Sequence, residues 1–265
     1  VISIKKKRYS KHWIELYYQL KSNRWDVIID LRNTLISRLV RKNKIYRLSN
    51  KNEQLHKVVH LSQLMKIRKK ISPKLYVSKK FKEEAAFFIK KNDINNKTIA
   101  ISPVTNWRRK NWPIKYFALL LESLFNEKSV SISKAIILGD NNDNNYCEQL
   151  RKITNCKNVI NLAGLPSVLA IHEIVKKCVL FVGNDSGLSH LSAASGTNTL
   201  SLFGPSKEKV YKPWGKNGFF IRTPKTYEEL VNVKGYNRFD NNSLMEELSV
   251  EDVKKKCIKI LKNQH

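Results

Sequence analysis

Short apolar runs alternate with amphipathic segments from about residue 97 to the end of the chain. Five of these runs have the length and composition of strands: Thr98–Ser102, Lys134–Leu138, Asn158–Leu162, Cys178–Val182 and Thr199–Phe203. The segments between them repeat apolar residues at helical spacing, which predicts helices over 114–126, 144–153, 167–177 and 187–195. This βα alternation predicts an α/β fold built on a parallel sheet.

The first 90 residues have a less regular pattern. It predicts, in chain order, a strand at Val1–Ile4, a helix at His12–Lys21, a strand at Asp26–Asp30, a helical stretch at Leu55–Lys66, an extended linker at Pro73–Val77 and a helix at Lys82–Lys90. We therefore expect two domains, over residues 1–90 and 91–265. Within the second domain we expect a variable loop over 205–242 and a final helix over 250–261.

The strand that ends at Val182 continues directly into a turn of small residues and then a helix. Asp185 is suited to cap this helix, which we expect to begin near Ser186. The first N–H groups of a helix have no partner within it, and the helix dipole places partial positive charge there, so a diphosphate fits this end. Gly187 lets a ligand come close, and His190 lies one turn along on the same side. Because βα units without a ligand share these features, the motif alone leaves both interpretations open.

A second loop of interest follows the strand at Thr98–Ser102. It carries three consecutive cations, Arg108, Arg109 and Lys110, ahead of a helix that begins beside Pro113. Cations in a loop after a parallel strand are suited to compensate a pyrophosphate. We expect the loop to face solvent, and a solvated loop without a ligand would have a similar composition.

Six segments, in this order along the chain, resemble the motifs of glycosyltransferase family 9, the heptosyltransferases that build the inner core of lipopolysaccharide. They are Asp26–Leu31, Lys110–Pro113 with Phe117 and Ala118, Ile136–Asp140, Asn161–Gly164, Asp185–His190 and Leu202–Pro205. The resemblance extends from about Trp25 to the C-terminal helix. The joint order of the motifs is more specific than any one of them.

The resemblance implies a GT-B architecture, in which two Rossmann-like domains with parallel sheets face each other across a cleft. The C-terminal domain of the family holds most of the nucleotide sugar, and the N-terminal domain lies on the acceptor side. The opening strand and Gly-Asp loop of the family, roughly 60 residues at about 30 for each βα unit, have no counterpart here. We therefore expect an incomplete N-terminal domain and a general base that is absent from this chain.

The reaction implied by the resemblance is displacement at the anomeric carbon of a nucleotide-diphosphate sugar by an acceptor hydroxyl, with inversion and without a metal or other cofactor. ADP-heptose and a lipid-linked glycan of the lipopolysaccharide core are the expected donor and acceptor. Lys110, as the cation beside the departing diphosphate, and Asp185, as the group that holds sugar hydroxyls, are the expected catalytic residues. The expected donor-binding residues are Lys110, Gly139, Asp143, Asp185, Ser186, Gly187 and His190. Asp143 stands where the family often has a glutamate for the ribose.

Charge adds one expectation and one alternative. Fifty Lys and Arg against 22 Asp and Glu give a formal net charge of +28, which favours phosphate-rich partners such as an anionic membrane surface. A genome-wide bias toward Lys, Asn and Ile would produce the same charge without a binding role. The basic residues are spread throughout the chain, so we expect no nucleic-acid partner.

No apolar run reaches the ~20 residues of a membrane span, and the start lacks the apolar core of a signal peptide. We therefore expect a cytoplasmic protein, in peripheral contact with the inner membrane face. Two alternatives stay open: a transferase that uses another nucleotide sugar, and a relative that binds a nucleotide sugar or glycolipid without transferring the sugar.

Overall fold

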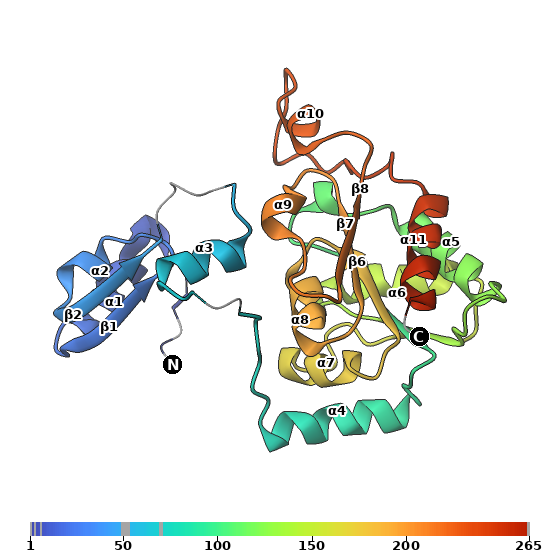
Figure 1. Cartoon of the computed structure of the whole chain (residues 1–265), viewed down its shortest axis with the longest axis horizontal. Coiled ribbons are helices and arrows are strands. Elements are labelled where there is room, and N and C mark those ends of the chain that lie inside the picture. Colours follow the sequence, from blue (N-terminus) through green and yellow to red (C-terminus); the bar gives the residue numbers. More distant parts are fainter. Residues whose placement is uncertain (1, 3, 6, 49–53, 69–70, 264–265) are drawn as a thin grey trace. The chain divides into compact units, whose positions relative to one another are not determined.

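The chain forms two compact units, Val1–Ile71 and Ser72–His265. A computed structural model describes residues 2, 4–5, 7–48, 54–68 and 71–263 (Figure 1). Each unit has its own parallel sheet, so the predicted α/β class is confirmed. None of the helices in these described ranges is long and apolar enough to cross a lipid bilayer.

The second unit is built on a six-stranded sheet. Its strands are β3 (Thr98–Ser102), β4 (Lys134–Ile137), β5 (Val159–Asn161), β6 (Leu180–Asn184), β7 (Thr199–Phe203) and β8 (Gly218–Arg222). They pair in the order β5-β4-β3-β6-β7-β8, and every pair is parallel. All residues of β3, β6 and β7 are buried. Burial on both faces explains why these strands read as continuous apolar runs.

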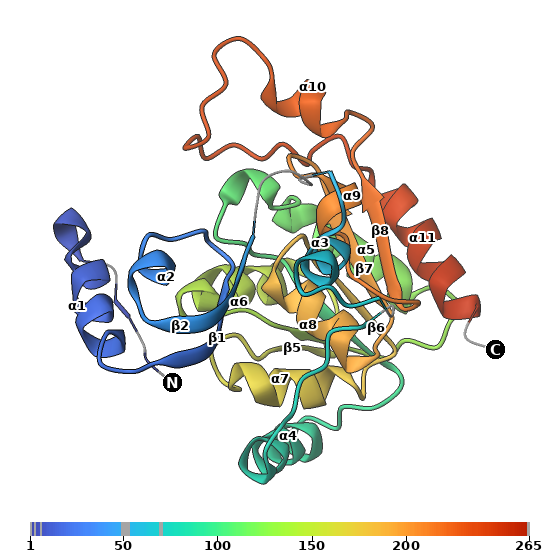
Figure 2. The ribbon, with the colours of Figure 1, turned by 60° about the vertical axis from the view of Figure 1, so that its left-hand side comes forward.

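Helices cover both faces of this sheet. They are α4 (Lys79–Lys91), α5 (Ile114–Phe125), α6 (Asn144–Ile153), α7 (Val168–Val175), α8 (Gly187–Ser195), α9 (Glu208–Tyr211), α10 (Tyr227–Val231) and α11 (Val250–Lys262), with short 3-10 turns η3 (Arg108–Lys110) and η4 (Asn141–Asp143). Figures 1 and 2 show α4 against α7 and α11 beside α5. Alternate strand residues divide between two cores: Ile99 and Ile101 pack with α5, α6 and α11, whereas Ala100 packs with α4 and α7.

The strand order changes direction at β3. From β3 the chain builds outward through β4 and β5, then returns to place β6 on the other side of β3. In open parallel sheets, ligands bind at the carboxyl ends of the strands beside such a switch point. The two strands approach closely there, since a Cβ on Gly183 would lie 2.9 Å from the carbonyl oxygen of Ser102.

The first unit has a two-stranded sheet. Its elements are η1 (Arg8–Ser10), α1 (Lys11–Leu20), β1 (Trp25–Asp30), α2 (Ile36–Leu39), β2 (Lys42–Arg47) and α3 (Lys57–Leu64), with β1 parallel to β2. The helices predicted at His12–Lys21 and Leu55–Lys66 and the strand predicted at Asp26–Asp30 are confirmed. The helix α2 and the strand β2 were not expected. The strand expected at Val1–Ile4 is not formed at Ile2 and Ile4, and Val1 and Ser3 lie outside the described residues.

Two expectations about boundaries differ from the structure. We expected the division at residue 90, but it follows Ile71, because Ala85 of α4 is buried in the core beneath α7. The expected loop over 205–242 contains α9, α10 and the edge strand β8. The residues of β8 are all half-buried, since an edge strand has a neighbour on one side only.

Candidate ligand-binding cleft

A cleft of about 790 Å³ opens at the switch point of the six-stranded sheet. Its walls come from the loops after β3, β4, β5 and β6, whose carboxyl ends meet at one edge because all strands are parallel. The lining residues are Val104, Thr105, Asn106, Trp107, Lys110, Gly139, Asp140, Asn141, Asp143, Gly164, Pro166, Ser167, Val168, Ile171, Asp185, Ser186, Gly187, Leu188, Leu191 and Arg238. The volume is in the range of small-molecule sites.

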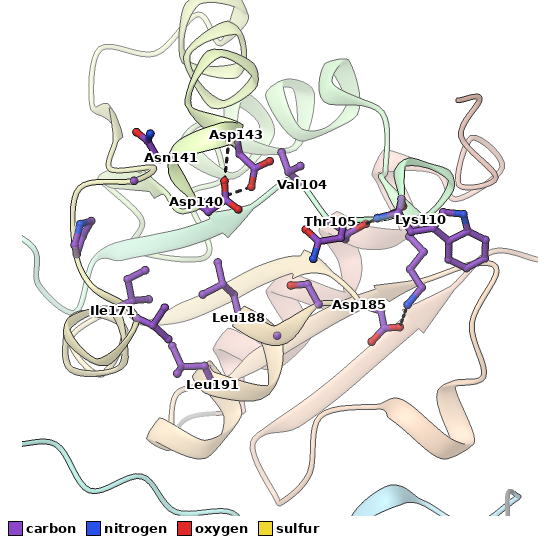
Figure 3. A pocket seen from close by; sticks show the side chains of 18 of the residues that line it. Val104, Thr105, Lys110, Asp140, Asn141, Asp143, Ile171, Asp185, Leu188 and Leu191 are labelled. Atoms are coloured by element: carbon purple, nitrogen blue, oxygen red, sulfur yellow. Dashed lines mark hydrogen bonds and ion pairs between the residues drawn. The ribbon is translucent and has the colours of Figure 1, made fainter. Parts of the chain in front are cut away.

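A partly buried ion pair lies at one end of the cleft (Figure 3). Lys110 Nζ is 2.5 Å from Asp185 Oδ2, and the two side chains are 20% and 7% exposed. Each charge therefore compensates the other at the surface of the cleft. The expectation that Lys110 faces solvent is therefore wrong: its ammonium group is turned inward onto the carboxylate that follows β6.

Hydrogen bonds through Asn184 fix the loop that carries Lys110. The buried side chain of Asn184 accepts from the backbone N–H of Trp112 (3.0 Å) and donates to the carbonyl of Pro103 (2.7 Å). It thereby joins both ends of the loop to β6. Within the loop, the backbone N–H of Thr105 donates to Asn111 Oδ1 (2.9 Å). Lys110 is thus held on a rigid turn.

The other two cations of the loop do not line the cleft. Arg109 is only 5% exposed, and its guanidinium group donates to the carbonyl of Asn237 and lies 3.5 Å from Asp240. Arg108 is exposed and lies outside the lining. Of the three cations of this loop, only Lys110 lines the cleft, and its contact with a pyrophosphate stays a prediction.

The amino end of α8 lies beside Asp185. Ser186 has extended backbone angles (φ −147°, ψ 173°), and α8 begins at Gly187, as the sequence predicts. Ser186 Oγ is buried and has no hydrogen-bond partner among the described residues. A Cβ on Gly187 would meet no atom within 4 Å, so the space beside this turn is open. The first N–H groups of α8 can therefore reach a ligand.

His190 lies beside Asp185 but is not among the residues that line the cleft. Its Nε2 is 3.9 Å from Asp185 Oδ1, and its side chain is 47% exposed. Its expected contact with a diphosphate stays a prediction. The geometry places it as a neighbour of the carboxylate.

The opposite end of the cleft is apolar on one side and acidic on the other. Val168 and Ile171 from α7 and Leu188 and Leu191 from α8 make the apolar wall. Figure 3 shows Ile171 and Leu191 on the far side of Leu188 from the ion pair. A cleft with an apolar wall at one end and a cation beside a helix end at the other offers the chemistry that a nucleotide requires: a surface for the base and donors for the phosphates.

The acidic side is the turn after β4. Asp143 Oδ2 accepts from the backbone N–H of Asp140 (3.2 Å), and Asp140 Oδ1 accepts from that of Asp143 (3.2 Å), which is a capping box. Burial raises the pKa of the Asp143 carboxyl, the Asp140 backbone hydrogen bond opposes this, and the Asp140 charge adds to it. One oxygen of Asp143 is thus occupied locally, and its expected contact with a ribose stays a prediction.

Glycines set the shape of this turn. Gly139 lines the cleft, as expected of a donor-binding residue, and a Cβ there would lie 3.2 Å from Cys147 Sγ. Gly164, after β5, has a φ of +77°, and a Cβ there would lie 2.7 Å from the Cα of Asn141. The two loops therefore pack too closely for a side chain at Gly164, whereas a side chain at Gly139 would press on the Asp143 turn and on α6.

Sequence reasoning missed several lining residues. Arg238 comes from the segment expected to be a loop, where no pattern marks a residue for the cleft. Ser167 is the N-cap of α7, and its backbone N–H and Oγ both donate to the carboxylate of Glu84 in α4 (2.6 and 2.7 Å). The apolar wall carried a signal, since its four residues fall at helical spacing on two predicted helices.

The sequence profile of glycosyltransferase family 9 (heptosyltransferase) matches residues 53–240, more than half of the chain. Lipooligosaccharide heptosyltransferase 2 of Haemophilus ducreyi is 31% identical over 118 residues, which are 43% of this chain and 33% of that protein. The protein of the same name from Campylobacter jejuni is 29% identical over 107 residues, 40% of this chain and 32% of that protein. The matched part thus spans about a third of the length of these curated relatives.

Solved structures share the fold. A glycosyl transferase family 9 protein from Veillonella parvula matches with a TM-score of 0.77 at 18% identity, covering 99% of this chain and 82% of that one. The E. coli ADP-heptose lps heptosyltransferase II matches with a TM-score of 0.70 at 18% identity, covering 94% and 80%. The parallel sheets, the ordered motifs around the cleft and the matching profile lead to one conclusion: this chain belongs to glycosyltransferase family 9, the heptosyltransferases, and has their GT-B-like α/β fold.

Proposed function

We propose that this protein is a glycosyltransferase that binds a nucleotide-diphosphate sugar in the cleft of its second unit and transfers the sugar to a glycan acceptor. The observation that carries the proposal is the Lys110–Asp185 ion pair beside the first turn of α8, at the end of a cleft whose far wall is apolar. A diphosphate between an ammonium group and a helix end would be stabilised at both sides. Membership of the family supports the same reading.

The proposed chemistry breaks the bond between the anomeric carbon and the diphosphate oxygen. An acceptor hydroxyl forms the new bond from the opposite face, so the configuration inverts, and the proton of the hydroxyl passes to a general base, a role for which we assign no residue of the cleft. Negative charge grows on the leaving diphosphate, where Lys110 and the N–H groups of Ser186 and Gly187 stabilise it. Asp185, fixed by Lys110, accepts hydrogen bonds from sugar hydroxyls.

We propose heptose as the sugar, ADP-heptose as the donor and a lipid-linked glycan of the lipopolysaccharide core as the acceptor. The support is the family and the names of the relatives, which include Lipopolysaccharide heptosyltransferase 3 of E. coli. Such an acceptor would place the protein at the cytoplasmic face of a membrane. The net charge of +28 favours contact with an anionic surface.

Calorimetric titration with ADP, ADP-heptose, UDP and UDP-glucose tests this function. We expect saturable binding of ADP-heptose that is tighter than binding of ADP and that Asp185→Ala reduces toward the ADP value. Arg108→Gln is the matched control, because Arg108 belongs to the same loop but lies outside the lining. Absence of binding by the folded chain would overturn the proposal. Binding without transfer to a core acceptor would favour a non-catalytic relative.

A further inference from the structure

We propose that Arg238 is a second phosphate-binding cation of this cleft, held in place by Trp107 and Arg109. The inference deepens the proposed function and rests on it. Arg238 lines the same cleft as Lys110 and Trp107, although it is separated from them by more than a hundred residues in the sequence. Its ligand would be the phosphate end of the nucleotide.

The balance of charges in the lining favours a second phosphate-binding cation. Its cations are Lys110 and Arg238, whereas its carboxylates are Asp140, Asp143 and Asp185. Lys110 is already 2.5 Å from the carboxylate of Asp185, so much of its charge is compensated before a ligand arrives. Among the described residues, Arg238 has no ion pair with a carboxylate. Arg238 is therefore the cation of the lining whose charge is available to a diphosphate.

Trp107 brings the two cations together. Arg238 Cζ lies 5.2 Å and Lys110 Nζ 5.8 Å from the centroid of the same indole ring. The indole Nε1 also donates to the carbonyl of Arg238 (2.9 Å), which fixes the backbone that bears the guanidinium group. Both cations thus contact the same side chain at this end of the cleft.

Arg109 holds the segment from the other side. Its buried guanidinium group donates to the carbonyl of Asn237, lies 3.5 Å from Asp240, and is 4.8 Å from the ring centroid of Tyr236. Asn237 in turn accepts from the backbone N–H of Phe239 (3.0 Å). These contacts flank Arg238 on both sides, so Arg109 acts as its positioning residue.

The residue type fits the role. A guanidinium group presents N–H donors in a planar fork that matches two phosphate oxygens, and it keeps its charge at all relevant pH values. Within the part of the chain that the structure describes, no side-chain hydrogen bond or ion pair occupies the N–H donors of Arg238, whose Cζ lies 5.2 Å from the ring centroid of Trp107. A lysine in this place would supply charge without the fork.

Calorimetry with sodium pyrophosphate, ADP and adenosine tests the proposal on the full chain. For Arg238→Gln we expect binding of pyrophosphate and ADP to weaken about tenfold or more, while adenosine binding changes less than about twofold. Arg238→Lys should recover part of the loss. Arg108→Gln removes the same charge from the neighbouring loop and should leave all three affinities unchanged, which controls for net charge.

Arg109→Gln tests the positioning role. If the variant is folded by circular dichroism, it should weaken ADP binding as Arg238→Gln does, and the double variant should lose little more than either single one. Wild-type affinity of Arg238→Gln for ADP would overturn the inference while leaving the proposed function intact. An equal loss for adenosine would also overturn it, since the segment would then shape the cleft without contacting phosphate. Failure of the unaltered chain to bind ADP would overturn both.

Discussion

The two units use strands in different ways. In the second unit, β3, β6 and β7 are buried along their whole length, both faces of the sheet are covered, and the cleft lies at the carboxyl edge. In the first unit, Val27 and Ile29 of β1 are 47% and 51% exposed, and β2 has no fully buried residue. The comparison teaches that in this chain the cleft lies where the strands are fully buried and their loops start from a packed core.

The largest expected effect comes from Trp112 in the second unit. Its fully buried ring packs edge-on against Tyr116 and Phe117, and its indole N–H donates to the carbonyl of Leu248 (2.8 Å). Trp112→Ala should lower the free energy of unfolding by about 3–5 kcal/mol. Trp25→Ala, at a half-buried position of β1, should cost less, about 1–2 kcal/mol.

Thiol labelling at increasing urea concentrations reports the unfolding of the second unit separately from that of the first. All four cysteines lie in the second unit, and Cys147, Cys178 and Cys257 are buried. Trp112→Ala should expose these thiols at lower urea, whereas Trp25→Ala should leave their exposure unchanged. A shift of thiol exposure by Trp25→Ala would show that the two units unfold together.

The Lys110–Asp185 ion pair is expected to have the next largest effect on the free energy of unfolding. Lys110→Met leaves the 7% exposed carboxylate of Asp185 without its cation, which should lower the free energy of unfolding by about 3 kcal/mol. Lys110→Met with Asp185→Asn should restore most of this stability, since no buried charge remains. Neither variant should bind ADP-heptose normally. Unaltered stability of Lys110→Met in thermal unfolding would contradict a compensated pair.

A smaller effect is expected where α4 holds the wall of the cleft. Glu84→Ala removes both acceptors of Ser167 and should cost about 1–2 kcal/mol, together with a several-fold loss of adenosine affinity and little change for pyrophosphate. Glu83→Ala is the matched control, because that exposed side chain makes only a 3.7 Å surface ion pair with Lys79. Equal losses for adenosine and pyrophosphate would mean that α4 supports the whole unit.

The smallest expected effects come from one carboxyl group in each unit, Asp30 in the first and Asp143 in the second. Ionisation of these two groups changes the stability of the fold with opposite signs. Burial would raise the pKa of Asp30 in the first unit, but hydrogen bonds from Ser37, Arg32 and Thr34 bring it below the ordinary value. Its ionised form therefore stabilises the fold above the ordinary pKa, and this contribution is lost as the pH falls. Burial raises the pKa of Asp143, so its ionised form costs stability at neutral pH, and the cost disappears on acidification.

Asparagine variants measure the two signs. Near pH 7, Asp30→Asn should lower the free energy of unfolding by about 1 kcal/mol, and Asp143→Asn should raise it slightly. Both differences should shrink when denaturant unfolding is repeated near pH 3. The same sign for both variants at neutral pH would contradict the assigned causes.

The sheet of the second unit could be predicted because its strands are buried on both faces. The run Cys178–Val182 predicted β6 to within two residues at each end, and the motif after it predicted where α8 begins. By contrast, β2 has the sequence Lys-Asn-Lys-Ile-Tyr-Arg, and such a polar stretch has no strand signal. The strand β8 was missed inside an expected loop, although Phe219, Phe220 and Ile221 form a short apolar run.

The site was predicted in part. Lys110, Gly139, Asp143, Asp185, Ser186 and Gly187 all line one cleft, so the sequence motifs located it, whereas His190 lies outside the lining. The inward turn of Lys110 could not be predicted, because it depends on where the loop after β3 meets the end of β6. The same holds for Arg238, whose place depends on two long-range hydrogen bonds: Trp107 donates to the carbonyl of Arg238, and Arg109 donates to the carbonyl of Asn237.

The empty space beside Gly187 makes the cleft observable. A cysteine introduced there would place its thiol in the open space at the beginning of α8, which the proposed diphosphate would cover. The half-buried Cys156 would be replaced by serine, so that only the new thiol reacts quickly with an alkylating reagent. A bound ligand would then slow alkylation of this thiol, so that occupancy by unlabelled ligands could be read from the rate of a chemical reaction.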